Sequence, residues 1–245
     1  MMKNLMWRAY LTRTTLKAHE KWARAGQQGS GRLVLEGKDL RDAVLPGPHL
    51  VAAQLVRCDA RKANMRVGNL TSIELIDCTW DGAMLEMTRL NKAVIENCRF
   101  VGAYMNVGHF IGAQVRGGDW SQVDLHNSTW TNAQMVDVCF QDARFQGAKL
   151  YGARLIGCNL MRANVAAMTP YDAVFERCDF RYCNLNYLKL KNTVFYKCGF
   201  YGCTGTPTME GACEVIEPDL SEAFDGSGVV DAAHLFQRWG LSTNA

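Results

Sequence analysis

A period of five residues runs through most of this chain and constrains its fold more than any other feature. From Leu35 to Phe200, every fifth residue is a candidate for the interior, and 32 of these 34 positions hold Leu, Met, Ile, Val, Phe or Trp. Two residues before each of them lies a second series, in which 26 of 34 positions hold Ala, Cys, Gly, Ser or Thr. A helix repeats its apolar side about every 3.6 residues and a strand about every 2, so neither explains this period. The chain must turn a corner every five residues.

Four such quintets close one square coil, so residues 20 apart are predicted to stack. At a strand spacing of about 4.8 Å the repeats form an all-β solenoid about 40 Å long. Inward thiols beside aromatic residues are predicted to be inert core filler. The alternative is a zinc site at Cys178, Cys183, Cys198 and Cys203, with all four sulfurs within about 2.3 Å of one point. The stacking is supported by six cysteines that share one register, with Gly118 and Val138 between them: Cys58, Cys78, Cys98, Cys158, Cys178 and Cys198.

Three quintets are close to a known pattern of a small residue, Asp or Asn, Leu or Phe, a polar residue and often Gly. They are Ala143–Gly147, Ala148–Gly152 and Cys158–Arg162, and they resemble the repeats of the pentapeptide repeat family. The resemblance covers about two thirds of the chain. It implies a right-handed quadrilateral β-helix, and most members of the family have no established enzymatic role. No catalytic, cofactor or metal site is therefore predicted, and the protein is not expected to be an enzyme.

The two ends differ from the repeats in charge. Residues 1–30 carry a net charge of +5, and they are predicted to form a basic helix that ends before Gly26. This helix is expected to cap the first coil; the alternative is a helix that binds a membrane surface or a nucleic acid. Residues 31–203, the predicted solenoid, carry +4.

Residues 204–245 form an acidic tail with a net charge of −6, in which Val229–Trp239 is predicted to be a short helix. In several members of the resembled family a C-terminal helix completes a two-fold dimer. The apolar residues of this helix, expected to be exposed, are therefore candidates for a homodimer contact, and a monomeric cap is the alternative. These candidates are Val230, Leu235, Phe236 and Trp239.

Outward positions on one side of the coil are apolar where polar residues are expected. Stacked 20 residues apart, they predict an exposed stripe of the kind that binds a protein partner. The alternative is that β-branched residues simply suit a pleated surface. The candidate partner-binding residues are Val56, Ile76, Val94, Val136, Ile156, Val174, Val194 and Tyr196. Another side is mildly basic and carries Arg89, Lys92, Lys149, Lys189 and Lys191.

These patterns predict a non-catalytic protein-binding rod, an adaptor or scaffold. The resemblance implies a more specific alternative: a bacterial protein that protects DNA gyrase or topoisomerase IV from antibiotics, as a dimeric rod with the acidic surface of DNA. The solenoid charge of +4 and the lack of a loop between quintets count against it. Direct nucleic-acid binding ranks third, because a net charge of +3 is too small unless the N-terminal helix and the basic side align.

The sequence also bears on the compartment. No window approaches the roughly 20 unbroken apolar residues of a membrane span, and Arg8, Arg13 and Lys17 occupy the place of a signal peptide's apolar core. Ten cysteines without a C-x-x-C pair do not indicate a disulfide framework. A cytoplasmic protein with no membrane span is expected.

Overall fold

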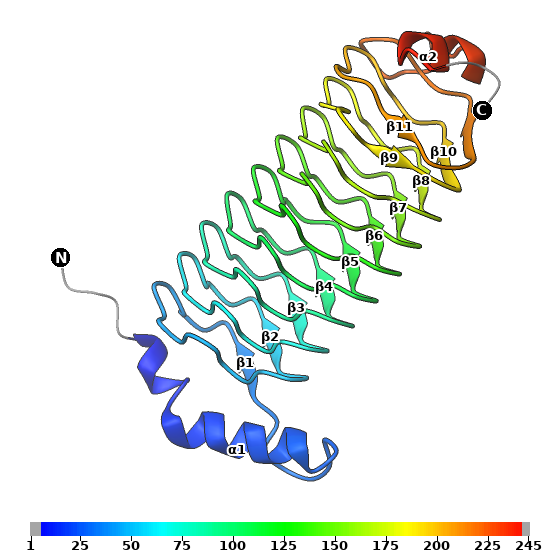
Figure 1. Ribbon diagram of the computed structural model, residues 1–245. Coiled ribbons are helices and arrows are strands. Elements are labelled where there is room, and N and C mark those ends of the chain that lie inside the picture. Colours follow the sequence, from blue (N-terminus) through cyan, green and yellow to red (C-terminus); the bar gives the residue numbers. More distant parts are fainter. Residues whose placement is uncertain (1–5, 242–245) are drawn as a thin grey trace.

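The computed structural model describes residues 6–241 and contains a parallel β-solenoid with a helix at each end (Figure 1). The predicted quadrilateral solenoid is confirmed. The N-terminal segment holds η1 (Met6–Ala9) and α1 (Arg13–Arg24), and the C-terminal segment holds α2 (Ala232–Arg238). Between them lie the strands β1 (Val34–Glu36), β2 (Gln54–Val56), β3 (Glu74–Ile76), β4 (Val94–Glu96), β5 (Gln114–Arg116), β6 (Gln134–Val136), β7 (Arg154–Ile156), β8 (Val174–Glu176), β9 (Lys189–Leu190), β10 (Thr193–Tyr196), β11 (Thr208–Met209) and β12 (Cys213–Ile216).

Each coil has four faces, and each face recurs every 20 residues. Ten strands form one parallel sheet in the order β1 to β8, then β10 and β12, with Leu35 opposite Leu55. We call this side the strand face. The other sides pair through single bridges such as Asn64 to Met84. In the first two coils, the ion-pair face holds residues 39–41 and 59–61, the mixed face 44–46 and 64–66, and the basic face 49–51 and 69–71.

The corners between faces are made by residues in the left-handed backbone region, such as Lys62 with a φ of 58°. The turn is closed by a hydrogen bond from the N–H of Ala63 to the carbonyl of Ala60, 3.0 Å long. The left-handed residue recurs every five residues, with the small residue just inside the corner. The hydrogen bond recurs at the corners other than the one that follows the strand face, where the N–H of Cys58, for example, donates to Sγ of Cys78. Gly, Asn and Asp suit the corner itself, because other residues lose about 1–2 kcal/mol there.

The interior is filled by the large residues of the period. Trp80, Trp120 and Trp130 are fully buried. The rings stack from coil to coil, with centroids 3.9 Å apart for Phe110 and Trp130. Rings of this size bring most of the apolar area that a narrow solenoid can bury. The predicted register is therefore the register of the core.

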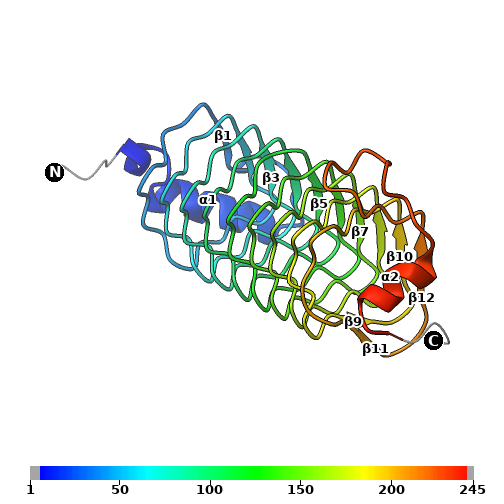
Figure 2. The same ribbon diagram turned by 90° about the horizontal axis from the view of Figure 1, so that it is seen from above.

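Both ends of the core are covered, as Figure 2 shows for α1 and α2 at opposite ends of the rod. α1 ends at Arg24, before Gly26, and residues 1–5 of the predicted N-terminal cap lie outside the described residues. It buries His19 and Trp22, and the N–H of Leu33 donates to Nδ1 of His19 over 2.9 Å. Burial, assisted by the nearby Arg32, lowers the pKa of His19 and favours the neutral ring that this bond requires.

The coil continues beyond residue 203, where the quintets end in the sequence. Thr193 pairs with Cys213 in the main sheet, and Gly199 bridges Asp219. On the way, Thr208 pairs with Lys189, one residue short of the usual offset of 20, and the offset is then restored. Because one residue is missing there, the sequence period does not extend into this last coil, and the coil includes residues of the predicted acidic tail 204–245.

Candidate binding surfaces

The strand face carries the predicted partner-binding stripe, but charged residues interrupt it. Ile76 pairs with Glu96, which pairs with Arg116, before apolar residues return at Val136. Glu176 interrupts the same column again after Ile156. The stripe is therefore a series of short apolar groups. All eight candidates lie on this face and are half-buried: Val56, Ile76, Val94, Val136, Ile156, Val174, Val194 and Tyr196.

The candidate dimerisation residues form the C-terminal cap of the chain's own core. The exposure expected for Trp239 is not observed: the side chain is 4% exposed, because its ring lies against Phe200 with centroids 5.2 Å apart. Leu235 is buried as well, whereas Val230 and Phe236 are half-buried. A dimer at this end remains a prediction, and it would use Val230 and Phe236.

A different set of apolar residues is exposed at the corner between the mixed and basic faces. Val67, Met87 and Val107 stack there in three successive coils and are 60%, 51% and 40% exposed. We call them the corner ridge. All three have left-handed backbones, with φ of 59°, 57° and 56°. The sequence contains the signal for this site, because these residues occupy the corner position of the quintet.

The corner ridge is unfavourable for folding in two ways. Its side chains expose apolar surface to water, and valine, being β-branched, is rarely found in the left-handed region. Further along the rod the same corner holds Asn127 and Gly147, whose residue types suit the backbone. It then holds Ala167 and Tyr187, which do not; Tyr187 has a φ of 58° and is 71% exposed. Three consecutive exceptions in one column therefore need an explanation outside the fold.

The basic face has no Asp or Glu at its outward positions from His49 to Lys191. Within residues 6–241, no ion pair involves Arg89, Lys92 or Lys149. Near the C-terminal end, Tyr151 stacks on Tyr171 with centroids 5.3 Å apart, and the ammonium of Lys191 lies 5.9 Å from the Tyr171 ring. Lys189 pairs with Glu210 over 3.0 Å.

On the ion-pair face, by contrast, arginines form ion pairs with neighbouring carboxylates. Arg99 bridges Asp81 and Asp119 with nitrogen–oxygen distances of 2.7 Å to each. Arg61 contacts Asp59 over 2.6 Å, and its hydrogen bonds keep the pKa of Asp59 below the usual value. Charge on this face is neutralised within the face, so the excess positive charge of the solenoid lies elsewhere.

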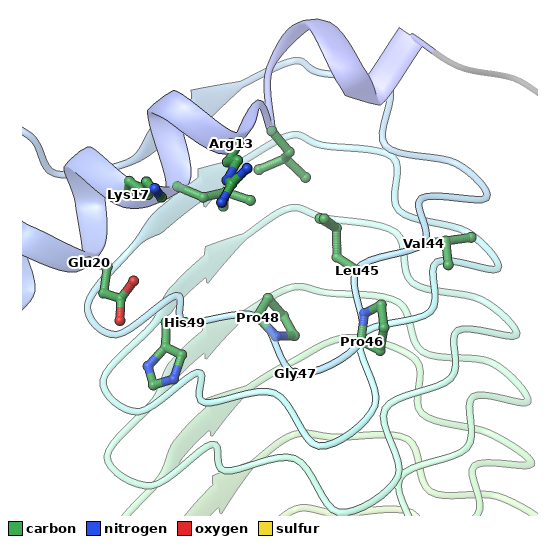
Figure 3. Close-up of a pocket in the computed structure, with 11 residues that line it drawn as sticks. Arg13, Lys17, Glu20, Val44, Leu45, Pro46, Gly47, Pro48 and His49 are labelled. Atoms are coloured by element: carbon green, nitrogen blue, oxygen red, sulfur yellow. The ribbon is translucent and has the colours of Figure 1, made fainter.

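A hollow of about 410 Å³ separates α1 from the first coil (Figure 3). Arg13, Lys17 and Glu20 of α1 line one wall, and the segment from Val44 to His49 lines the other. A second hollow of about 230 Å³ continues past Arg24, which pairs with Glu20 over 2.6 Å, to His49 and the outward residues beyond it. One side of α1 thus adjoins the beginning of the basic face.

Comparison with known proteins agrees with this architecture. The profile described as pentapeptide repeats matches residues 109–147, 139–166 and 172–204, with 8 copies. These residues carry pentapeptide repeats. No curated protein matches it.

Similar solved structures have low sequence identity to this chain. One is a trypsin-treated variant of QnrB1, a plasmid-mediated fluoroquinolone resistance protein, with a TM-score of 0.51 and 14% identity over 87% of this chain and 100% of that chain. Another is HetL, which is involved in heterocyst differentiation regulation in the cyanobacterium Nostoc sp. strain PCC 7120, with a TM-score of 0.45 and 15% identity over 86% and 97%. These likenesses concern the fold alone.

The inward thiols of the solenoid point at backbone carbonyls. Sγ of Cys183 donates to the carbonyl of Leu160 over 3.0 Å, and Sγ of Cys203 to that of Phe180 over 2.9 Å. Burial raises the pKa of Cys178 well above the usual value for a thiol. Across residues 6–241, no three His, Cys, Asp or Glu side chains are grouped to hold a metal ion. No helix in that range is long and apolar enough to span a bilayer.

Proposed function

We propose that this protein is a non-catalytic binding rod, an adaptor or scaffold that presents the corner ridge to a protein partner. The single observation that carries the proposal is the exposure of Val67, Met87 and Val107 at left-handed positions. Strained residues that the fold does not require are a reason to look for a function. Large exposed apolar groups are a common mark of protein interaction sites.

The apolar side chains of the ridge indicate what kind of surface the partner presents. Three side chains about 4.8 Å apart along the rod fit an apolar groove or a row of apolar side chains parallel to the solenoid axis. Full burial would contribute about 1.5–3 kcal/mol for each valine or methionine. Next to the ridge, Arg66 pairs with Glu86 over 2.7 Å, which provides a polar rim.

Site-specific photo-crosslinking in the native host tests this proposal. A photoreactive amino acid at position 87 is expected to capture one partner, and the same group at position 127, two coils along the same corner, is expected not to. The double variant Val67→Asn, Val107→Asn should abolish the capture at position 87 while the rod stays folded. Equal capture from both positions, or none from position 87, would contradict the proposal.

Fluoroquinolone protection is the second candidate, favoured by the fold similarity to QnrB1. It predicts that bacteria expressing this chain survive higher fluoroquinolone concentrations and that DNA gyrase or topoisomerase IV co-purifies with it. Unchanged susceptibility would remove this candidate and leave the adaptor role intact. A homodimer through Val230 and Phe236 would accompany either role and is measured by analytical ultracentrifugation.

A further inference from the structure

The distribution of charge over the rod is more informative than its total. On the other three faces and their corners, many arginines have a carboxylate partner, as in the pairs Arg99–Asp119, Arg162–Asp142 and Arg154–Glu176. The basic face, by contrast, has no acidic outward position from His49 to Lys191, and Glu210 follows in the last coil, where it pairs with Lys189. The solenoid's excess of positive charge is therefore gathered on one side, where it can act on a ligand.

The cations of the basic face are spread along the rod. Arg89, Lys149 and Lys189 share one outward column, and the first and last of them are five coils apart. At about 4.8 Å per coil this column spans about 24 Å, or about two thirds of a duplex turn. The side chains between them are short and polar, including Thr129 and Thr169. Lys, Arg and Thr are the residue types that contact phosphates.

α1 extends this surface at its N-terminal end. Arg24 and His49 line the same hollow, and Lys17 lines the neighbouring one (Figure 3). Within the described part of the chain, no ion pair involves Arg13 or Lys17. The helix therefore adjoins the beginning of the basic face at Arg24, which pairs with Glu20, and Arg13 and Lys17 lie further along the helix beside residues 44–49.

We propose that the basic face and the adjoining side of α1 bind a double-stranded nucleic acid through its phosphates, without reading its sequence. An acidic protein fits less well, because protein interfaces centre on apolar anchors and, apart from the corner column at its border, Ile111 is the only exposed large apolar residue among the described outward positions of this face. A single strand fits less well, because it needs free aromatic platforms for its bases. Tyr151 and Tyr171 are stacked on each other, and Lys191 lies over the Tyr171 ring.

Salt-dependent binding to a fluorescent 30-base-pair duplex tests the proposal with the full chain. Three cations that form no ion pair within the described residues, Arg89, Lys92 and Lys149, predict a slope of about −3 for log K against log salt, because each neutralised phosphate contributes about −0.9. Lys191 is left out of this count because it interacts with Glu210. The double variant Arg89→Gln, Lys149→Gln should reduce the slope by about 2 and weaken binding at least tenfold at low salt. The matched control, Arg61→Gln with Arg99→Gln, removes the same charge from the ion-pair face and should leave the slope unchanged.

Four outcomes would overturn the proposal. They are no duplex binding at low salt, equal losses in the two double variants, tighter binding of a single strand of the same length, and equally effective displacement by poly-glutamate. Circular dichroism confirms that each variant is folded. The corner-ridge variant Val67→Asn, Val107→Asn should bind the duplex like the wild type, which separates this proposal from the adaptor role.

Discussion

Trp120 in the core and Val107 on the corner lie less than one coil apart. Burial in the core explains the residue type at Trp120, whereas neither burial nor backbone conformation favours a valine at position 107. Trp120 is fully buried, and its ring centroid lies 4.3 Å from that of Phe100. Val107 is 40% exposed and has a left-handed backbone that a β-branched residue rarely adopts. Packing therefore explains the residues in the interior of this rod, whereas it does not explain the exposed apolar residues of the corner ridge.

The largest expected effect comes from emptying the core. Trp120→Ala should lower the free energy of unfolding by about 3–5 kcal/mol, because it removes a buried ring and leaves a cavity. Urea denaturation followed by circular dichroism measures this loss. Tyr187→Ala is the control, since that side chain is exposed at a corner and should change stability by less than about 0.5 kcal/mol. Similar losses in the two variants would contradict the assigned register.

A smaller loss is expected where the corner meets the core. Gly118 has a φ of 90°, and a Cβ there would lie 2.1 Å from the carbonyl oxygen of Cys98. Gly118→Ala should therefore cost about 1–3 kcal/mol through overpacking, in addition to backbone strain. Gly102 has a φ of 62° with nothing near its Cβ position, so Gly102→Ala isolates the strain. Equal thermal stability of the two variants would rule out the close contact.

The corner ridge should give an effect of opposite sign. Val67→Asn and Val107→Asn should each raise the free energy of unfolding by about 0.5–1 kcal/mol, because Asn adopts the left-handed conformation more readily. Val101, which is half-buried and has no left-handed backbone, is the matched control and should not gain from Asn. A shift of the urea midpoint to lower concentration in the ridge variants would show that the corners are not strained.

The last prediction needs no substitution and compares the reactivity of thiols inside and outside the coil in the wild-type protein. Cys139 is half-buried at an outward position and should react first with a thiol reagent in the folded protein. Cys178 and Cys183 are buried with raised pKa values caused by burial, so few of their thiolates form and they should react only on unfolding. Peptide mass spectrometry distinguishes the sites. Early labelling of Cys178 would contradict its inward position.

The interior could be predicted because each quintet repeats the same pattern of inward and outward residues. Large residues alternate with small ones, and the stacked cysteines set the offset of 20, so the core needed no knowledge of the ends. The outer surface was harder to predict. The sequence shows that the strand-face candidates are apolar. Their exposure, however, depends on neighbours one coil away, such as Glu96 beside Ile76. The corner positions could be located in the sequence, but only the structure shows that their backbone is left-handed and that Val or Met is unfavourable there.

The sequence by itself determined the solenoid, its register and the inward placement of the thiols, because a strict period leaves one way to bury every large residue. Only the tertiary structure decided which cations keep free charge, since ion pairs form between coils, as in Arg99 with Asp119. It also decided that Trp239 closes the core and that α1 adjoins the basic face. Those contacts join segments outside the period to residues far away in the chain, so no local pattern encodes them.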